Sequence, residues 1–394
     1  MIRVLQVFGE PLSNGGQEAF IMNTYRNIDK SKIQFDFFTP YYCEEKWISE
    51  EIKRLGGKLY TSNNKFNTKK VKKIFIDECK KFLNNNKYDI VHIHSGSLFA
   101  LTYGAKIARK SGAQKVIVHA HATGKNNFKY RIIKLISNFV IVKYATDYFA
   151  CSHYVAKWKF PKKIVKQKKY EVIKNGIELK KYKFSENIRE KYREDLSVKE
   201  KFVVGNVGRL SKEKNHIFLI EVFNEIYKKN KDAVLLLVGG GCEDAAGAFQ
   251  KNIKNKVEEY SLENVVHFLG SRNDVYNVLQ AMDVFVFPSL YEGLGIVAIE
   301  AQASGLITIC SENVPEEANL TKLFKKIDLS KGPDYWANEI LKYKEVKRND
   351  KTLEIKKMGY DATDCVKKLE KIYLENGTLE GAAFFAVRSA YRRL

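Results

Sequence analysis

Short runs of Val, Ile, Leu and Phe, separated by longer helical stretches, limit the folds open to this chain more than any other feature. The runs are continuously apolar, and strands of that kind belong in a parallel sheet that is covered on both faces. Strands that alternate with helices are typical of α/β proteins. The first series of runs comprises Ile2–Phe8, Phe35–Phe38, Asp89–His94, Lys115–Ala120, Tyr148–Cys151 and Tyr170–Ile173.

A second series follows a polar, charged stretch at 175–201 that has the composition of a connector. Its runs are Phe202–Val207, Ala233–Val238, Val265–Leu269, Val284–Phe287 and Leu306–Cys310. A length of 394 residues is about right for two domains. We therefore predict two doubly wound, Rossmann-like α/β domains that face a central cleft, where the carboxyl ends of their strands bind ligands.

The predicted first domain spans residues 1–175 and the second spans 176–359. A helix at about 360–374 is expected to pack back on the first domain. Residues 375–394 form a tail of different composition, because Lys and Ile do not occur from 376 onward and Ala and Arg prevail. Two interpretations of the tail stay open, a basic amphipathic helix on a membrane and an appendage introduced for expression.

Positive charge is concentrated in one half of the chain. Residues 1–200 contain 40 Lys and Arg against 19 Asp and Glu, whereas residues 201–394 contain 28 against 27. An excess confined to one half indicates a surface for an anionic partner, and nucleic acid, an acidic membrane and a phosphorylated substrate all qualify. No apolar run approaches the ~18–20 residues of a spanning helix, and the N-terminus lacks the features of a signal peptide, so we expect a cytoplasmic protein. Six separated cysteines without a CxxC pair are expected to be reduced.

The segment Glu292–Glu300 (EGLGIVAIE) follows the apolar run VFVF and carries the most specific signal. Gly293 and Gly295 let the backbone approach a ligand, and the N–H groups that start the next helix would face an anion such as a diphosphate. Glu292 could accept hydrogen bonds from sugar hydroxyls, and Glu300, on the helix, could accept them from a ribose. The alternative is a glycine turn with an ordinary capping acid.

The loop GRLSKEKNH, directly after the run FVVGNV, places Arg209 and Lys214 at the carboxyl edge of the second sheet. Both cations can converge on the diphosphate expected at Gly293–Ile296 and neutralise charge on a departing nucleotide. A solvated basic loop is the alternative, and Lys212 is expected to be such a bystander.

The first half offers a glycine pair and four histidines. Gly15–Gly16 opens onto a helix like a phosphate-facing loop, although a tight strand-to-helix turn has the same composition. His119 and His121 lie on one face at the end of a run, where a histidine can bind a substrate hydroxyl or transfer a proton. His92 and His94 repeat this spacing and are interpreted as packing and hydrogen-bonding residues. The His, Asp and Glu spacings indicate no metal site.

Taken together, these residues resemble the retaining glycosyltransferases of family four, which have the GT-B fold, and within that family the bacterial exopolysaccharide and capsule transferases. The resemblance runs from Ile2 to about Tyr373. The segments that carry it are GGQEAFIMNTYRNID, YDIVHIH, ATDYFACS, VGRLSKEKNH, AMDVFVFPSLYEGLGIVAIEAQASGL and DYWANEI. The E-x7-E match and the Arg/Lys phosphate motif stand in the right order with the right strands between them, which makes the resemblance specific.

The resemblance implies a nucleotide-sugar donor, with UDP as the nucleotide, held mainly by the second domain. Arg209 and Lys214 would bind its diphosphate, Glu300 its ribose, and Glu292 its hexose. The implied catalytic residues are Glu292, Arg209, Lys214 and His121. The implied donor-binding residues are Gly16, Arg209, Lys214, Ser271, Arg272, Glu292, Gly293, Leu294, Gly295, Ile296 and Glu300, with Ser271 and Arg272 near the base. The chain departs from the family at residues 239–242 (GGGC), where an acid and a proline are common, and at Gln17, where a small residue is common.

The implied reaction transfers a hexose or N-acetylhexosamine to a sugar acceptor, lipid-linked, in bacterial exopolysaccharide or capsule synthesis. Retaining glycosidases use a carboxylate nucleophile, whereas this family resembles a front-face catalyst in which the leaving phosphate receives the acceptor's proton. No divalent metal and no cofactor is then expected.

A lipid-linked acceptor would explain the excess of positive charge in the first half of the chain. In residues 51–183, 31 Lys and Arg outnumber 7 Asp and Glu and interleave with aromatic residues, which suits an anionic bilayer. We therefore expect peripheral attachment to the inner face of the plasma membrane, with a solvated surface as the alternative. Rival functions are a nucleotide-sugar 2-epimerase, a transferase with a soluble acceptor, and a nucleic-acid-binding protein. Because the sequence has no recognisable nucleic-acid-binding module, no specific nucleic acid is expected.

Overall fold

The computed structural model describes residues 1–13, 15–66, 69–123, 128–240 and 246–375. Contacts divide the chain into two compact units. The first contains residues 1–176 and the C-terminal helix from Ala362, and the second contains residues 177–361. The boundaries expected from the sequence were at 175 and 359.

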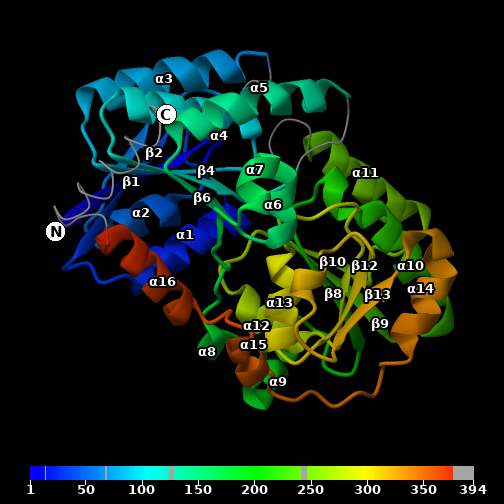
Figure 1. Ribbon diagram of the computed structural model, residues 1–394. Helices are drawn as coiled ribbons and strands as arrows, with labels where there is room; N and C mark the ends of the chain where they lie inside the picture. The colour runs from blue at the N-terminus through cyan, green and yellow to red at the C-terminus, as the bar shows by residue number, and fades with distance from the viewer. Residues whose placement is uncertain (14, 67–68, 124–127, 241–245, 376–394) are drawn as a thin grey trace. The chain divides into compact units, whose positions relative to one another are not determined.

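The first unit is built on a seven-stranded sheet in the order β3-β2-β1-β4-β5-β6-β7, in which all neighbouring strands are parallel. Helices α1, α2 and α16 lie on one face of this sheet, and α3, α4 and α5 lie on the other (Figure 1). The strand order reverses between β1 and β4, which is the topological switch point where such sheets bind ligands. The strands are β1 (Ile2–Phe8), β2 (Ile33–Thr39), β3 (Leu59–Thr61), β4 (Ile90–Ser95), β5 (Lys115–Ala120), β6 (Asp147–Ala150) and β7 (Glu171–Val172). The helices are α1 (Gly16–Asn27), α2 (Lys46–Arg54), α3 (Val71–Asn85), α4 (Leu98–Lys110), α5 (Phe128–Tyr144), α6 (His153–Lys159), α7 (Lys162–Lys166) and α16 (Ala362–Leu374).

Helix α16 is part of the first core although it follows the whole second unit in sequence. Val366, Leu369 and Tyr373 are buried among side chains of the first sheet and of α1. The ring of Tyr373 meets that of Phe35 edge to face at 5.8 Å. An apolar face at helical spacing therefore attaches the end of the chain to the unit that contains its beginning.

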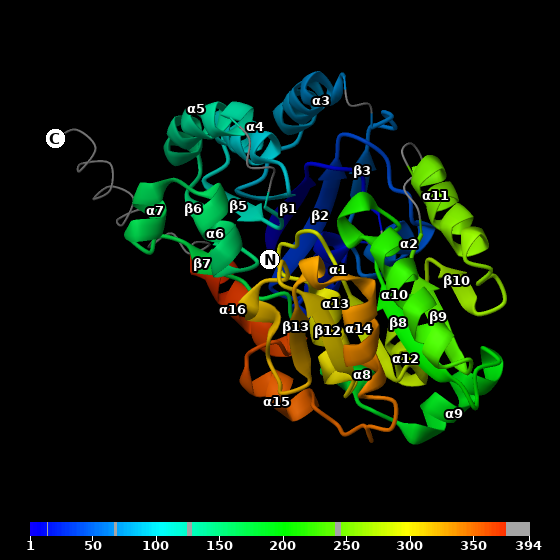
Figure 2. The ribbon, with the colours of Figure 1, turned by 90° about the vertical axis from the view of Figure 1, so that its right-hand side faces the viewer.

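The second unit has a six-stranded sheet in the order β10-β9-β8-β11-β12-β13, again with parallel neighbours. Its switch point lies between β8 and β11. Helices α10, α11 and α14 cover one face, and α8, α9, α12, α13 and α15 cover the other (Figure 2). The strands are β8 (Phe202–Val207), β9 (Ala233–Val238), β10 (Val266–Gly270), β11 (Val284–Phe287), β12 (Ile307–Ser311) and β13 (Phe324–Ile327). The helices are α8 (Leu179–Tyr182), α9 (Glu186–Asp195), α10 (His216–Lys229), α11 (Ala246–Glu259), α12 (Val275–Ala281), α13 (Ile296–Ala303), α14 (Gly332–Leu341) and α15 (Thr352–Lys357), with 3-10 turns η1 (Lys212–Lys214), η2 (Glu316–Ala318) and η3 (Leu329–Lys331).

The prediction of two parallel α/β sheets is confirmed, and every predicted run is a strand. Two strands, β3 and β13, were not predicted. Each is the outermost strand at one edge of its sheet, so it pairs with a neighbouring strand on one side only. The sequence of β13, FKKI, exposes its two lysines, so it lacks the continuous apolar pattern that identified the others.

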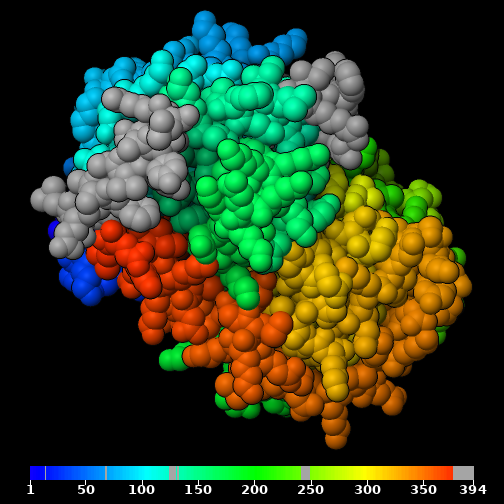
Figure 3. Space-filling view, viewed as in Figure 1, coloured from blue at the N-terminus to red at the C-terminus, as the bar shows by residue number. Residues whose placement is uncertain are grey.

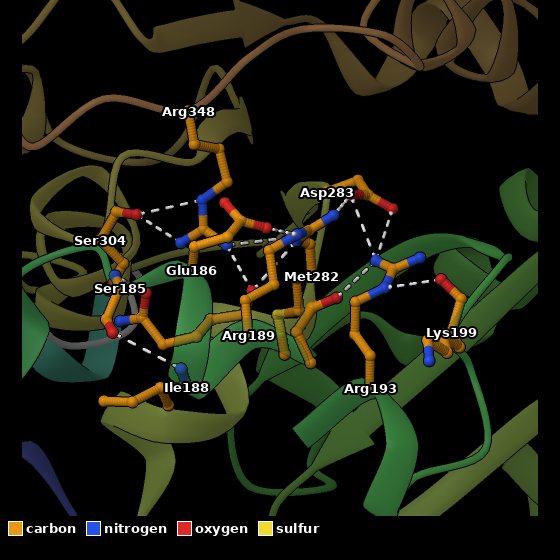
Figure 4. A network of polar contacts seen from close by, with 12 residues as sticks. Ser185, Glu186, Ile188, Arg189, Arg193, Lys199, Met282, Asp283, Ser304 and Arg348 are labelled. Atoms are coloured by element: carbon orange, nitrogen blue, oxygen red, sulfur yellow. Dashed lines mark hydrogen bonds and ion pairs between the residues drawn. The ribbon is translucent and has the colours of Figure 1, made fainter. Parts of the chain in front are cut away.

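The segment interpreted as a connector, 175–201, is structured and carries α8 and α9. From α9, Arg189 and Arg193 bond to Asp283, at the start of β11, and Arg348 joins them from the loop before α15 (Figure 4). The Arg189 guanidinium donates to the carbonyl oxygens of Gln280 (3.0 Å) and Met282 (2.8 Å), at the carboxyl end of α12. The three arginines thus cap a helix end whose carbonyls would otherwise lack partners.

Two further expectations concern whole-chain properties. None of the described helices is long and apolar enough to cross a membrane. None of the five cysteines in the described residues is in a disulfide, and Cys242 lies outside those residues.

Candidate active site

The carboxyl edge of the second sheet brings two of the sequence-predicted motifs together at the switch point. The loop after β8 carries Arg209 and Lys214, and the loop after the neighbouring strand β11 carries Glu292. Lys214 Nζ lies 2.6 Å from Glu292 Oε1, and these side chains are only 19% and 11% exposed. Residues 78 positions apart in sequence therefore form one ion pair at the place where an open α/β sheet binds ligands.

The Lys214 side chain is held in place along its length. Its ammonium group lies 4.7 Å from the centre of the Phe287 ring. Its methylene groups pass Gly208 so closely that a Cβ there would be 3.4 Å from three of them. Because the stem is packed, less conformational entropy is lost when the ammonium binds an anion.

The two loops are also tied by hydrogen bonds that the sequence did not predict. The Leu290 N–H donates to the Glu213 carbonyl oxygen at 2.8 Å, and the Tyr291 hydroxyl donates to Glu213 Oε1 at 2.8 Å. The exposed Arg209 interacts electrostatically with both Glu213 and Tyr291. Arg209 is thus near Lys214 on the same loop and is open to solvent.

The glycine turn of the E-x7-E segment leads into α13. Gly295 precedes the helix with φ of +80°, a conformation that only glycine adopts readily. Among the described residues, no side chain caps the first N–H groups of α13. Gly293, Leu294 and Ile296 form this turn with Gly295. A Cβ on Gly295 would lie 3.9 Å from Glu292 Cγ, so the amino end of α13, which favours anions, lies close to the partner of Lys214.

Glu300 lies one turn inside α13 and has a partner that the sequence did not reveal. The hydroxyl of Tyr182, on α8, donates to Glu300 Oε1 at 2.8 Å. Burial raises the pKa of Glu300 to about 7, and the bond from Tyr182 partly offsets this shift. A carboxyl group in this state can accept hydrogen bonds from two ribose hydroxyls once it is ionised.

Ser271 and Arg272 follow β10, two strands away from the ion pair. Ser271 is exposed, and Arg272 donates to both carboxylate oxygens of Asp274 at 2.7 and 2.6 Å. A Cβ on Gly240 would lie 3.6 Å from Ser271 Cβ, so the ends of β9 and β10 meet there. The remainder of the glycine segment, from residue 241 to Cys242, lies outside the described residues.

The first unit holds Gly16 and His121, both at the carboxyl edge of its seven-stranded sheet. Gly16 is the exposed first residue of α1. The backbone N–H of His121 donates to the Ser95 carbonyl oxygen at 3.3 Å, and its ring Nε2 lies 3.0 Å from His94 Nδ1. Its other nitrogen, Nδ1, is buried without a partner, and burial lowers the pKa of His121 to about 3. Both ring nitrogens therefore point into the first unit in this conformation.

The second unit thus assembles the cations, the glycine turn and both glutamates. Ser271 and Arg272 lie further along the same edge, whereas Gly16 and His121 belong to the first unit. The sequence analysis missed Tyr182, Tyr291 and Glu213. No local pattern identifies them, since each matters only through a partner distant in sequence.

Comparisons with known protein families find a match in each half of the chain. The profile of the family Glycosyltransferase Family 4 matches residues 14–181, and that of Glycosyl transferases group 1 matches residues 187–331. The chain belongs to the family 4 glycosyltransferases of group 1. Among relatives, EpsF of Bacillus subtilis is 29% identical over 94% of this chain and 96% of its own length.

Two other relatives of this glycosyltransferase have more specific names. The UDP-Gal:alpha-D-GlcNAc-diphosphoundecaprenol alpha-1,3-galactosyltransferase of Escherichia coli is 34% identical over 59% of each chain. The capsular polysaccharide biosynthesis glycosyltransferase CapH of Staphylococcus aureus is 25% identical over 95% of this chain and 99% of its own. Over nearly its whole length, the chain is therefore similar to a glycosyltransferase that is named for bacterial capsular polysaccharide biosynthesis.

Solved structures identify the fold of this glycosyltransferase. Anabaena HepE, in complex with UDP and glucose, has a TM-score of 0.70 and 19% identity, covering 95% of this chain and 99% of its own. The two units accordingly have the GT-B fold predicted from the sequence.

Proposed function

We propose that this glycosyltransferase transfers a hexose or N-acetylhexosamine from a UDP-sugar to a sugar on a lipid diphosphate, with retention of the anomeric configuration. The observation that supports this most is the Lys214–Glu292 ion pair beside the amino end of α13. Lys214 and the amino end of α13 offer a cation and backbone N–H groups for a diphosphate. Glu292, the partner of Lys214, offers a carboxylate for sugar hydroxyls.

Each group of the second unit then has one task. Arg209 and Lys214 bind the diphosphate and stabilise its charge as the bond from C1 to the phosphate oxygen breaks. Glu292 accepts hydrogen bonds from the hexose, and Glu300, positioned by Tyr182, accepts them from the ribose. Because an ammonium has three donors, Lys214 can keep its bond to Glu292 while it donates to a phosphate.

Retention follows from front-face attack. The acceptor hydroxyl forms its bond to C1 on the side from which the phosphate leaves, and its proton passes to a phosphate oxygen. Such a mechanism needs neither a nucleophilic carboxylate nor a metal at the diphosphate, because the two cations balance the charge. His121 is assigned to the active site by family resemblance, and in the structure its Nε2 lies 3.0 Å from His94 Nδ1.

The names of relatives support the choice of donor and acceptor. HepE was solved with UDP, and the Escherichia coli relative is named for UDP-Gal and a diphosphoundecaprenol acceptor. A lipid-linked acceptor suits the first unit, where α5 exposes apolar side chains: Leu135 is 63% exposed, Ile136 61% and Phe139 80%. Lys143, also exposed, follows them on the same helix.

We propose that the exposed apolar residues of α5 (Leu135, Ile136 and Phe139), together with Lys143 and the other lysines of the basic region 51–183, attach the protein to an anionic membrane surface. This surface would be the inner face of the plasma membrane. Atoms of α5 and α6, coloured teal to green, are on the surface of the first unit that Figure 3 shows. An amphipathic helix with basic residues binds membranes through apolar insertion together with attraction to anionic lipids.

The donor assignment is tested first by thermal unfolding with UDP and a panel of UDP-sugars in EDTA. A ligand at 100 times its Kd adds about 2.7 kcal/mol, so binding raises Tm clearly. Turnover with the stabilising donor and a lipid-linked acceptor follows, and the anomeric configuration of the product is read by NMR. Conversion of the donor without any acceptor would instead identify a 2-epimerase.

Two variants link the reaction to the site. Arg209→Ala and Glu292→Gln should each lower kcat at least about 100-fold, which corresponds to about 2.7 kcal/mol of lost transition-state stabilisation. Arg209→Ala should unfold at nearly the wild-type temperature, because Arg209 is exposed. Glu292→Gln should remain folded but unfold at a lower temperature, because it removes the charge partner of the largely buried Lys214, so both variants are assayed well below their own Tm. Near-normal turnover by either variant would refute the assigned roles.

Membrane attachment is tested with vesicles of phosphatidylcholine, with and without phosphatidylglycerol, at low salt. Phe139→Ser should weaken binding to the anionic vesicles about tenfold or more, because burying a Phe side chain contributes about 1.5–3 kcal/mol. Leu353→Ser is the matched control, since Leu353 is 71% exposed in the second unit. Equal binding by all three proteins would contradict attachment through α5.

A further inference from the structure

Four histidines of the first unit form a compact group on one face of its sheet, and we call them the histidine cluster: His92, His94, His119 and His121. His92 and His94 share a face of β4 because side chains two apart on a strand point the same way. Strand pairing sets His94 opposite His119 on β5, and His121 follows that strand. The first three are 0% exposed.

Half of the ring nitrogens in this cluster have no partner. His92 Nε2, both nitrogens of His119, and His121 Nδ1 are buried and make no hydrogen bond. Buried polar atoms in native proteins are almost always paired with protein, ordered water or an ion. Four unpaired imidazole nitrogens within one cluster therefore indicate that a partner of this cluster is missing.

The remaining hydrogen bonds orient two of the rings toward the centre. His92 Nδ1 bonds with the Tyr373 hydroxyl at 2.6 Å, and His94 Nε2 bonds with Gln6 Oε1 at 2.8 Å. These outer bonds leave His92 Nε2 and His94 Nδ1 directed at the cluster. Histidines that bind metals are oriented in this way, by a bond from the second ring nitrogen to an oxygen.

Aromatic side chains also surround the rings. The rings of Phe20 and Phe149 meet that of His119 edge to face at 5.1 and 5.9 Å. An ion there would be shielded from water.

The spacing is close to that of a coordination site. One ligand atom from each of His92, His94 and His119 lies within 4.8 Å of the others. Imidazoles on one tetrahedral ion with metal–nitrogen bonds of about 2.0–2.1 Å have ring centres about 5 Å apart. The observed separation is 5.3 Å for His92–His119 and 5.3 Å for His94–His119. His92 and His94 are closer, at 4.0 Å, and have to separate slightly.

We propose that His92, His94 and His119 bind one divalent transition-metal ion in the core of the first unit. Imidazole ligands and tetrahedral geometry favour Zn²⁺ over Mg²⁺ or Ca²⁺, which prefer oxygen. His121 is next to the open fourth position, because its Nε2 is 3.0 Å from His94 Nδ1. An ion on that nitrogen of His94 takes the place of this hydrogen bond and so frees His121 to turn.

Apart from its effect on the orientation of His121, this ion is separate from the diphosphate and sugar binding that is assigned to the second unit. It does not alter the expectation that UDP binds in EDTA, and a failure of either proposal leaves the other standing.

The first test measures metal in the untagged full-length protein. Because the site is buried, the protein is refolded from denaturant with Zn²⁺ or Co²⁺ and then dialysed against a weak chelator. We expect about one ion per folded chain by mass spectrometry and, with Co²⁺, the visible absorption bands of a four-coordinate nitrogen site. Refolded protein with less than a tenth of an ion per chain would overturn the proposal without any mutation.

The second test assigns the ligands. His119→Leu should fold, since neither ring nitrogen of His119 has a partner to lose, and its metal content should fall at least tenfold. His92→Gln should lose the ion as well. The matched control is His153→Gln, an exposed histidine of the same unit, which should retain it. Equal retention by His119→Leu and His153→Gln would show that the ion is bound elsewhere and would overturn the assignment.

Discussion

Replacing Asp283 by Asn should strongly destabilise the second unit although it changes no side-chain volume. The Asp283 carboxylate accepts hydrogen bonds from Arg189, from Arg193 (3.2 Å to Oδ2) and from the Val203 N–H (2.7 Å). Arg348 lies in the same cluster, where burial and the charge of Arg189 lower its pKa to about 9. The substitution therefore leaves three guanidinium groups without their central negative charge.

The magnitude follows from this burial. The side chains of Asp283 and Arg189 are 15% and 17% exposed, and that of Arg193 is 9% exposed. Breaking a buried ion pair by removing one partner costs about 3–5 kcal/mol. For a unit of this size each kcal/mol lowers Tm by about 2–4 °C, so Tm should fall by about 6–20 °C.

The assay is thermal unfolding followed by the fluorescence of Trp336, which is buried in the second unit, with Trp47 and Trp158 replaced by Phe. Asp232→Asn is the control, because Asp232 is 67% exposed in its pair with Lys201 and should cost less than about 1 kcal/mol. A loss of less than about 1 kcal/mol in Asp283→Asn would refute the reasoning. If that variant does not fold, Arg348→Met is added to it, and the double variant should recover a cooperative unfolding transition, since the pair of substitutions removes opposite charges.

Three further predictions concern the second unit. Glu300→Gln should leave the free energy of unfolding unchanged near pH 4.5 and raise it by up to about 3 kcal/mol at pH 8. The reason is that the wild type, with a folded-state pKa of about 7, loses stability as the pH rises from about 4.5 through 7. An equal Tm difference between the two proteins at both pH values would contradict this. Gly239→Ala should lower the free energy of unfolding in urea by at least about 2 kcal/mol, since φ is +145° and a Cβ would lie 2.0 Å from the Gly208 carbonyl oxygen. A change of less than about 0.5 kcal/mol would show that this clash does not occur. Lys214→Met should weaken UDP binding, measured by calorimetry, about 10- to 100-fold because it removes one charge-assisted hydrogen bond. The control Lys212→Met should bind UDP normally, since Lys212 is exposed. Equal Kd values for the two variants would show that Lys214 does not belong to the site.

The sequence was informative wherever a short pattern determines a structure. Continuous apolar runs predicted both parallel sheets, because a strand buried on both faces must be apolar throughout. The glycine turn Gly293–Gly295 and the spacing of Glu292 and Glu300 placed one glutamate before α13 and the other on it. These features depend on neighbours in sequence, and a single chain reveals them.

The sequence was silent where function depends on tertiary partners. Tyr182 lies in a stretch with the composition of a connector, and only folding shows that it bonds to Glu300. The four histidines were read as two separate pairs, and only the register of β4 against β5 shows that they form one cluster. Such contacts follow from topology and register, which no local pattern encodes.

The place of α16 in the first core has a consequence for how the protein is made. The second unit is continuous in sequence, from Ile177 to Asp361, so all of its residues leave the ribosome before α16 does. The first unit cannot close its core until Val366, Leu369 and Tyr373 have been synthesised. The second unit therefore has all of its residues available for folding before the first unit has a complete core.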